Sequence, residues 1–279
     1  MSAGPYTVRG VSLGGVYTSL QVPQLGALLD VGIPIRAFAG TDRIFLSHGH
    51  GDHVGALFGL LGIRGLLHRK EAPKVFLPAP IAGPIAEAIS AMERLQRHAL
   101  PVDLVPMVAG DEHRLRPDLW VRAFRTHHPV PSLGYLFFDR VAKLKAAYAD
   151  LPGREIGRRK AAGEDLFETR ERLELAYATD TLIRVLDTAP AIARARVLIL
   201  ECTFLDGRKS LEASRAGCHI HLDELLEAAP RLENERVVLM HFSQIYTPRE
   251  VHAILADRLP PELAEKVVVF APRSGPWPG

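Results

Sequence analysis

Three histidines and one aspartate lie within six consecutive positions in the segment His48-Gly49-His50-Gly51-Asp52-His53. Imidazole nitrogens and carboxylate oxygens are the donors that a borderline divalent cation such as zinc accepts, and the glycines between them let a tight loop turn the side chains inward. The spacing therefore predicts a metal site. A solvated His-rich loop is the alternative, but such a loop needs no buried strand before it, and Ile44 to Ser47 has the composition of one.

The order of these residues indicates two adjacent metals. The chain leaves the predicted strand at His48, which puts His48 and His50 on one side of the loop, and a helix begins at Asp52 and His53. The apolar run Val54 to Leu61 continues that helix against a core. One metal would take the first pair of residues, and the other metal would take the second pair.

Other apolar runs also end in residues that can bind a metal. These are Leu119–Arg125 before Thr126-His127-His128, Leu175–Thr179 before Asp180, and Val237–Met240 before His241. Each run is typical of a strand, so the residues that follow would converge on one edge of a sheet sandwich. A single histidine after a strand is more often an ordinary hydrogen-bonded residue, but together with the first motif a shared metal site is the better interpretation.

Taken in this order, the residues resemble the metallo-β-lactamase superfamily, and within it ribonuclease Z, the endonuclease that trims tRNA 3′ trailers. The short plant-like form is the more similar branch, and the resemblance extends over most of the chain. The segments that carry it are Thr126–Tyr135, Glu201–Phe204, Cys218–His221 and His241–Thr247. The Gly-Tyr pair that begins six residues after His128 identifies His128, and not His127, as the ligand.

The resemblance implies a complete set of ligands for two metals. The first metal would be held by His48, His50 and His128, the second by Asp52, His53 and His241, and both by a bridging Asp180. Zinc is favoured because the diiron relatives carry glutamate, a harder oxygen ligand, where this chain has His50. We therefore expect two Zn²⁺ per chain, with Mn²⁺ or iron as the alternatives.

Such a site would hydrolyse a phosphodiester. Two divalent ions sharing a water would lower its pKa enough to supply hydroxide at neutral pH and would take up charge on a phosphoryl oxygen. Asp52 would orient that hydroxide or accept its proton. His219 matches the family's catalytic histidine and is the expected general acid for the departing ribose 3′-oxygen, supported by Glu174 or Glu201. An exposed helix start is the alternative interpretation of His219 and His221.

Two positions depart from the family pattern. The family has glycine before the bridging aspartate and arginine in the segment after the last histidine, whereas this chain has Thr179 and Ile245. The missing arginine removes a phosphate contact, so metal binding should survive while tRNA specificity is less firmly implied. The amino-terminal segments 14–20 and 28–32 match the plant-like form, and Asp30 within them is expected to steady the loop of the first motif.

Charge is unevenly distributed in a chain that is almost neutral, with 34 basic and 32 acidic residues. A charged segment at about residues 139–172 is expected to protrude from a single domain of residues 1–279. It would clamp RNA phosphates or, equally, be a solvated helical insertion. The candidate RNA contacts are Arg154, Arg158, Arg159 and Lys160. A second basic set follows the first helix and consists of Arg64, His68, Arg69, Lys70 and Lys74.

Length and composition fit a compact α/β enzyme of 279 residues, 47% of them apolar. Strands are expected at 74–78, 119–125, 135–139, 173–179, 197–201, 237–240 and 267–270, and helices at 85–97, 182–187, 222–229 and 248–259. The resemblance makes this pattern the four-layer αββα metallo-β-lactamase sandwich. No signal peptide or membrane-length apolar run is present, and with only Cys202 and Cys218 a reducing cytoplasm is the expected setting.

The function implied by the resemblance is a zinc-dependent endoribonuclease that removes 3′ trailers from precursor tRNA. A homodimer, in which the protrusion of one subunit grips RNA for the other, is implied in the same way. Two alternatives stay open: a hydrolase that acts on a small phosphodiester, lactone or thioester through the same metals, and a non-enzymatic RNA-binding module with a relic site. The intact ligand series argues against the second.

Overall fold

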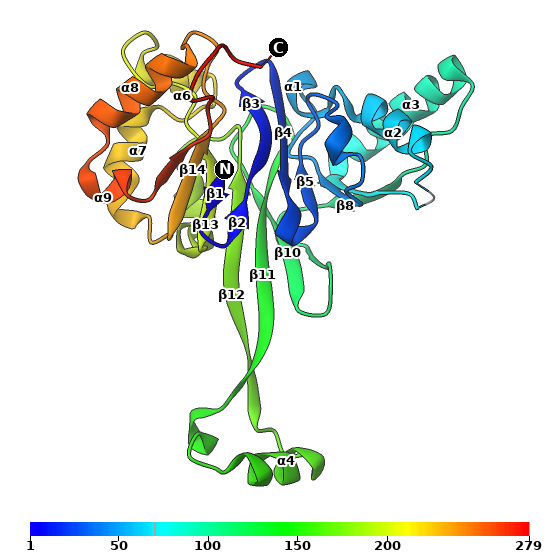
Figure 1. Cartoon of the computed structure of the whole chain (residues 1–279), viewed down its shortest axis with the longest axis vertical. Coiled ribbons are helices and arrows are strands. Elements are labelled where there is room, and N and C mark those ends of the chain that lie inside the picture. The colour runs from blue at the N-terminus through cyan, green and yellow to red at the C-terminus, as the bar shows by residue number, and fades with distance from the viewer. Residues whose placement is uncertain (70, 279) are drawn as a thin grey trace.

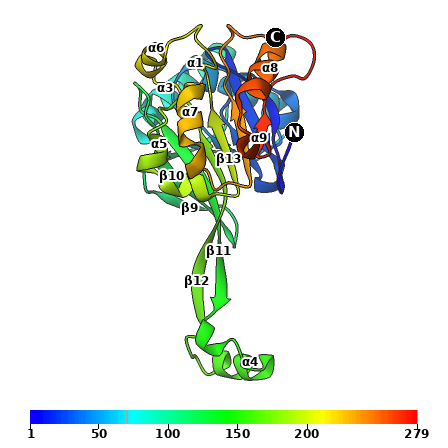
Figure 2. The same cartoon turned by 90° about the vertical axis from the view of Figure 1, so that its left-hand side faces the viewer.

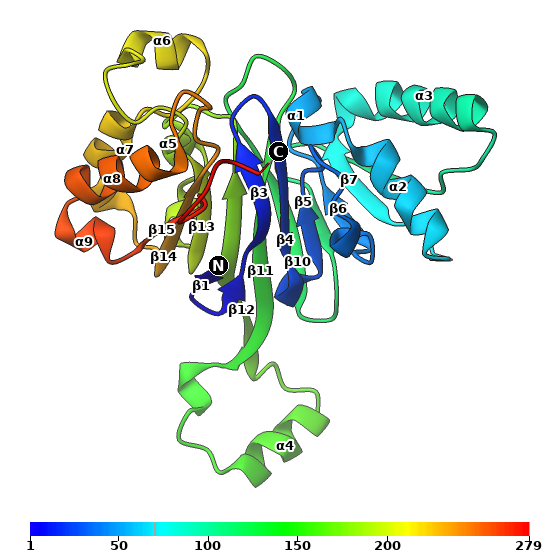
Figure 3. The same ribbon diagram turned by 45° about the horizontal axis from the view of Figure 1, so that its top comes forward.

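Two β-sheets packed face to face form the centre of the molecule in the computed structural model, which describes residues 1–69 and 71–278. Helices α1 to α3 lie outside one sheet and helices α5 to α9 outside the other (Figures 1 and 3). The expected four-layer αββα sandwich is therefore confirmed. Among the described residues, no helix has both the length and the hydropathy to cross a membrane.

The first sheet contains six strands in the order β3-β4-β5-β6-β7-β8. Their bounds are β3 Arg9–Leu13, β4 Tyr17–Val22, β5 Ala27–Leu29, β6 Arg43–Phe45, β7 Lys74–Pro78 and β8 Asp103–Met107. The helices that cover it are α1 Gly51–Val54, α2 Leu57–Leu66 and α3 Ala79–Gln96. β3, β4 and β5 pair antiparallel and β5 to β8 pair parallel, so the strand that leads into the first motif, β6, is central.

The expected continuous helix from Asp52 to Leu61 is wrong, because the chain forms two helices, α1 and α2. The amide of Ala56 donates a hydrogen bond to Val31 O at 2.9 Å instead of to the preceding turn, which redirects the chain between them. Gly55 permits this tight turn, since a Cβ there would lie 2.4 Å from Gly51 O. The short α1 is thus held against the loop that follows β5.

The second sheet contains seven strands in the order β15-β14-β13-β12-β11-β10-β9. Their bounds are β9 Glu112–Arg114, β10 Leu119–Arg125, β11 Leu133–Leu144, β12 Phe167–Ala178, β13 Val197–Glu201, β14 Arg236–Met240 and β15 Val267–Val269. Its helices are α5 Val185–Thr188, α6 Leu211–Ala216, α7 Leu222–Ala228, α8 Pro248–Arg258 and α9 Pro261–Ala264. A small separate sheet pairs β1 Ser2–Ala3 with β2 Tyr6–Thr7.

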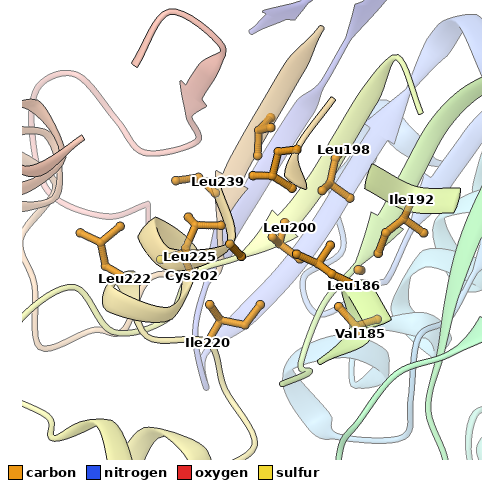
Figure 4. Close-up of a cluster of buried hydrophobic side chains, with 14 of the residues drawn as sticks. Val185, Leu186, Ile192, Leu198, Leu200, Cys202, Ile220, Leu222, Leu225 and Leu239 are labelled. Atoms are coloured by element: carbon orange, nitrogen blue, oxygen red, sulfur yellow. The ribbon is translucent and has the colours of Figure 1, made fainter. Parts of the chain in front are cut away.

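Strand β13 shows why the central strands are continuously apolar. Leu198 and Leu200 point toward the helices, where Figure 4 shows them with Leu225 of α7, while Val197 and Ile199 face the other sheet. A strand that is buried on both faces gains from an apolar residue at every position. The parallel pairing of β12, β13 and β14 then brings their carboxyl ends to one edge.

Aromatic side chains join the two sheets close to the first motif. Phe45 of β6 stacks on Phe76 of β7 with ring centroids 4.6 Å apart, and Tyr135 and Phe137 of β11 meet it edge-on at 5.2 and 5.1 Å. The hydroxyl of Tyr135 donates to Leu46 O at 2.7 Å. Each aromatic pair contributes about 0.5–1.5 kcal/mol beyond its buried area. These contacts fix the second sheet against the strand that carries the histidine-rich loop.

Strands β11 and β12 extend well beyond the sandwich as a two-stranded ribbon (Figures 1 and 2). The ribbon carries a 3-10 turn at Ala146–Tyr148 and helix α4, Gly153–Ala161, at its tip. The strands expected at 135–139 and 173–179 are therefore too short. The distal ribbon carries charged, mostly exposed side chains, so it lacks the apolar pattern that identifies a strand in the sequence.

Candidate metal centre and active site

The candidate ligands are brought together by the ends of four strands. His48 follows β6, His128 follows β10, Asp180 follows β12 and His241 follows β14. The six-stranded sheet supplies the first of these and the seven-stranded sheet supplies the other three. The site therefore lies at one edge of the sandwich and needs both sheets to be in place.

The first group of donors consists of three imidazoles and one carboxylate oxygen. His50 Nδ1 lies 3.0 Å from His48 Nε2 and 3.1 Å from His128 Nε2. Asp180 Oδ2 lies 3.7 Å from His48 Nε2 and 3.8 Å from His128 Nε2. All four donor atoms lie within 4.8 Å of one another, which is the compactness that one cation requires.

The second group is built on the other oxygen of the same aspartate. Asp180 Oδ1 lies 3.3 Å from His53 Nε2 and 3.2 Å from His241 Nε2. Asp52 Oδ2 lies 3.3 Å from His53 Nε2 and 3.7 Å from His241 Nε2. Asp180 thus presents one carboxylate oxygen to each group, which is the arrangement of a bridging ligand.

These residues fit two divalent cations. Donors on a tetrahedral shell with bonds of about 2.0–2.1 Å lie about 3.3 Å apart, close to the separations within both groups. The Nε2 atoms of His53 and His241 are also buried without a hydrogen-bond partner. Unsatisfied buried polar atoms are rare because they cost free energy, and a cation would satisfy both of them.

Asp30 holds the ring of His53 in place from behind. It is fully buried and accepts hydrogen bonds from Ser47 N at 2.7 Å, Ser47 Oγ at 2.8 Å and Tyr177 OH at 2.5 Å, and its Oδ2 lies 2.8 Å from His53 Nδ1. A carboxylate on the far nitrogen of a ligating imidazole fixes the tautomer that offers Nε2 to the metal. Asp30 therefore orients both the loop and the ring.

The backbone is strained at the same place. Asp30, Asp180 and His241 have φ values of 57°, 46° and 60°, a left-handed conformation that residues other than glycine seldom adopt. The turn between β3 and β4 approaches the donor groups closely, since a Cβ on Gly14 would lie 2.9 Å from His241 O. The amide of Gly15 in the same turn donates to Asp52 Oδ2 at 3.1 Å. Strain of this kind is typical of functional sites.

The protonation states of His48, His128 and Asp180 suit metal binding. Burial lowers the pKa of His48 to about 2 and also lowers the pKa of His128, so both rings are neutral. Burial would raise the pKa of Asp180, but His241 and His53 hold it well below its ordinary value. Neutral imidazoles and ionised carboxylates are the forms that bind cations. His53 differs, because Asp180 and Asp30 outweigh burial and raise its pKa.

His219 lies beside the two groups and is held by Glu201. Its Nδ1 is 3.2 Å from both carboxylate oxygens of Glu201, and its ring centroid is 5.4 Å from that of His241. Burial would lower the pKa of His219, but the charge and hydrogen bond of Glu201 raise it to about 9. The ring is thus protonated at neutral pH, as a general acid must be.

The structure separates the two acidic residues that the sequence offered as supports for His219. Glu174 lies on β12, six residues before Asp180, and six residues of extended chain span about 20 Å. It accepts from Tyr6 OH at 2.7 Å and pairs with Arg172 and Arg196. A supporting role for Glu174 at the site is therefore wrong, and Glu201 is the residue in contact with His219.

Two other histidines do not join the two donor groups. The amide of His127 donates to Thr181 Oγ1 at 2.9 Å and its Nε2 lies 2.9 Å from Thr188 Oγ1, so His128 and not His127 joins the donors. His221 caps helix α7, where its Nδ1 accepts from the Asp223 amide. His221 is buried, so the interpretation as an exposed helix start is wrong for this residue.

The basic candidates have mixed environments. The four candidate RNA contacts lie on α4 at the tip of the ribbon (Figure 2). Arg158 and Arg159 pair with Glu155, and Lys160 Nζ lies 5.3 Å from the Phe167 ring centroid. In the second basic set, Arg64 is buried and donates to three backbone carbonyl oxygens, of Ala39, Thr41 and Glu71, so it stabilises the fold. Lys70 of that set lies outside the described residues.

Sequence reasoning missed two polar residues of the site. Tyr177 donates to Asp30, and Thr203 Oγ1 lies 3.1 Å from His241 Nδ1 while donating to Glu201. Thr203 was visible inside the segment Glu201–Phe204, but its role depends on a contact across strands. Tyr177 was concealed because a tyrosine in an apolar strand is ordinarily part of the core.

Comparisons with known proteins agree with the resemblance in the sequence. The profile described as "Beta-lactamase superfamily domain" matches residues 21–242. A tRNase Z from Arabidopsis thaliana is 36% identical over 265 residues, covering 94% of both chains. A chloroplastic tRNase Z of the same plant is 35% identical, covering 94% of this chain and 74% of the relative. The fold matches the crystal structure of the short form of human tRNase Z with a TM-score of 0.62 at 19% identity, covering 95% of this chain and 96% of that one.

Proposed function

The chain belongs to the ribonuclease Z family of the β-lactamase superfamily, a family of metal-dependent endoribonucleases, and from this premise we propose that it removes the 3′ trailer from precursor tRNA with two zinc ions. The family relationship over almost the whole length of both chains supports the substrate. The observation that carries the chemistry is the position of Asp180, which offers one oxygen to each donor group.

Seven residues would hold the cations. They are His48, His50 and His128 in the first group, Asp52, His53 and His241 in the second, and Asp180 in both. Cations bound there lower the pKa of water and stabilise charge on a phosphoryl oxygen. The imidazole-rich donor set favours zinc, with manganese or iron as alternatives.

The protein's own groups would handle the protons. Asp52, whose Oδ2 accepts from the Gly15 amide, would orient the attacking water or accept its proton. His219 would donate a proton to the ribose 3′-oxygen as it leaves, and Glu201 holds the ring for this step. The products would be a tRNA with a free 3′-hydroxyl and a trailer with a 5′-phosphate.

End-mapped digestion of a trailer-bearing precursor tRNA tests this proposal. We expect one cut close to the mature 3′ end, lost on adding a chelator and restored by zinc. Cleavage of a small phosphodiester, lactone or thioester without cleavage of the tRNA would instead favour the small-molecule hydrolase. RNA binding without any hydrolysis would favour the relic module.

We also propose that the protrusion grips RNA and that the protein is a homodimer in a reducing, cytoplasmic compartment. The charged tip with Arg154, Arg158, Arg159 and Lys160 supports the first point, although Arg158 and Arg159 share an ion pair with Glu155. The free thiols of Cys202 and Cys218 support the compartment. Sedimentation velocity of the full chain tests the dimer, and a monomer at micromolar concentration would contradict it.

A further inference from the structure

One aromatic side chain beside His219 has no role in the chemistry derived above. The ring centroid of Phe204 lies 6.1 Å from that of His219, with the ring planes 77° apart, and the side chain is only partly buried. Its backbone is fixed from both sides, because its amide donates to Ile220 O at 3.3 Å and its carbonyl accepts from Leu222 N at 2.8 Å. Phe204 therefore offers a rigid apolar surface next to the proposed acid.

A cation without a partner accompanies this ring. Lys209 Nζ lies 5.4 Å from the Phe204 centroid, and within residues 1–69 and 71–278 it makes no hydrogen bond or ion pair. The adjacent Arg208, in contrast, pairs with both Asp206 and Glu250. The charge of Lys209 is therefore available to a ligand, whereas the charge of Arg208 is already neutralised.

An aromatic ring with a free cation suits a single-stranded nucleotide. Bases stack on aromatic rings, and lysines pair with phosphates. Because stacking reads no base edge, such a site would accept any of the four bases. The same pair of residues would bind a double helix poorly, since paired bases are already stacked on each other.

We infer that Phe204 and Lys209 form a subsite for the nucleotide whose ribose 3′-oxygen leaves. The inference rests on the proposed function: if His219 protonates that oxygen, the nucleoside that carries it must lie against His219 and within reach of Phe204. Its base would stack on Phe204. The long stem of Lys209 lets the ammonium leave the ring and pair with the 5′-phosphate of the same nucleotide.

The first test replaces the ring and the base in turn. Phe204→Leu keeps the apolar packing but removes the aromatic face, so kcat/KM for precursor tRNA should fall about 5- to 100-fold. The bound zinc content should not change, and Phe204→Trp should retain RNA cleavage. On precursor tRNA that lacks only the base of that nucleotide, wild-type enzyme should lose the same factor and Phe204→Leu should lose nothing more.

Three results would overturn the subsite. They are unchanged cleavage of intact RNA by Phe204→Leu, a loss of bound zinc in that variant, and a further loss on the abasic RNA. The abasic substrate with wild-type enzyme alone keeps the test valid even if the variant is unstable. Failure of the proposed function would look different, because wild-type enzyme would then not cut the precursor tRNA at all.

The second test concerns the phosphate. For the binding of precursor tRNA, a plot of log affinity against log salt concentration has a slope that reports the number of phosphate contacts. Lys209→Gln should reduce the magnitude of this slope by about 0.7, the value for one contact to a single strand. Lys209→Arg should keep the slope, and so should Lys74→Gln, which removes a surface lysine that is paired with Asp103. A slope that is unchanged in Lys209→Gln would exclude the phosphate contact.

Discussion

The same two strands, β11 and β12, connect two regions whose polar groups differ: at one end they are buried and partly unpaired, and at the other they are exposed and paired. At the sandwich end they carry Tyr135 and Tyr177, and β12 leads into Asp180, where buried imidazole nitrogens remain without partners. The segment that joins their far ends carries exposed charges that are already paired, as in Lys145 with Asp165 and Arg158 with Glu155. Unsatisfied buried donors require a ligand, whereas exposed ion pairs contribute little and need none.

This difference predicts different roles for the two regions. The edge of the sandwich that carries the donor groups is buried and chemically specific, so single substitutions there should abolish activity. The protrusion presents many weak, screened charges, so its loss should affect only how well a large substrate is held. Substitutions in the two regions should therefore differ both in magnitude and in which substrate reports them.

Replacement of the shared carboxylate should have the largest effect. Asp180→Ala removes one donor from each group, so we expect metal content to collapse and activity on every substrate to fall by more than about 10⁴-fold. Metal analysis by mass spectrometry and end-mapped cleavage measure the two losses. Asp187→Ala, which removes an exposed carboxylate seven residues away, is the matched control. An active, metal-depleted Asp180→Ala would contradict the bridging role.

His219→Ala should slow cleavage without emptying the site. Loss of the proton donor should reduce kcat for RNA by about 10²- to 10⁴-fold while both metals remain bound. Single-turnover cleavage rates and metal content are measured on the same preparation of the variant and compared with those of the wild-type enzyme. If the metals are lost instead, His219 is a ligand in the group formed with Glu201 and His241.

Asp30→Ala should weaken metal binding more modestly. It removes the acceptor that orients His53 and the Ser47 loop, so zinc affinity should fall about 10- to 100-fold. Competition with a chromogenic chelator measures the affinity. Glu174→Ala is the informative contrast, because it also removes a buried carboxylate, but one that lies away from the donors and contacts Tyr6. Equal losses of affinity would show that the effect is general destabilisation.

Deletion of the protrusion should have the smallest effect on the chemistry. Replacing residues 140–171 with a short turn should weaken binding of precursor tRNA about tenfold or more, since several phosphate contacts are lost. Hydrolysis of a small chromogenic phosphodiester should remain unchanged. Equal losses on both substrates would refute a role as an RNA clamp and would place the protrusion within the catalytic fold.

The sequence predicted best what is buried and repetitive. Strands β7, β10 and β13 have the expected bounds because their apolar runs are bounded by polar or turn residues. The ribbon of β11 and β12 was underestimated, since its distal part pairs in solvent with no apolar face. Strands β3 and β4 were not expected because Gly and polar residues interrupt their apolar pattern, and β5 was not expected because it is only three residues long.

Proximity across strands is what the sequence left open at the site. The donors could be proposed because each follows an apolar run, but the choice between Glu174 and Glu201 depended on where each falls along its strand. Glu201 ends β13 at the metal edge, and Glu174 lies near the opposite end of the parallel region of β12. The position of a buried carboxylate along its strand, and not its residue type, decides whether it reaches the donor groups.

Anomalous diffraction from crystals of the zinc-loaded protein tests the central claim most directly. The account predicts two peaks at the zinc edge, one among His48, His50 and His128 and one among Asp52, His53 and His241, with Asp180 bound to both. A single peak, or Asp180 and His241 lying beyond coordinating distance of the histidine-rich loop, would contradict it.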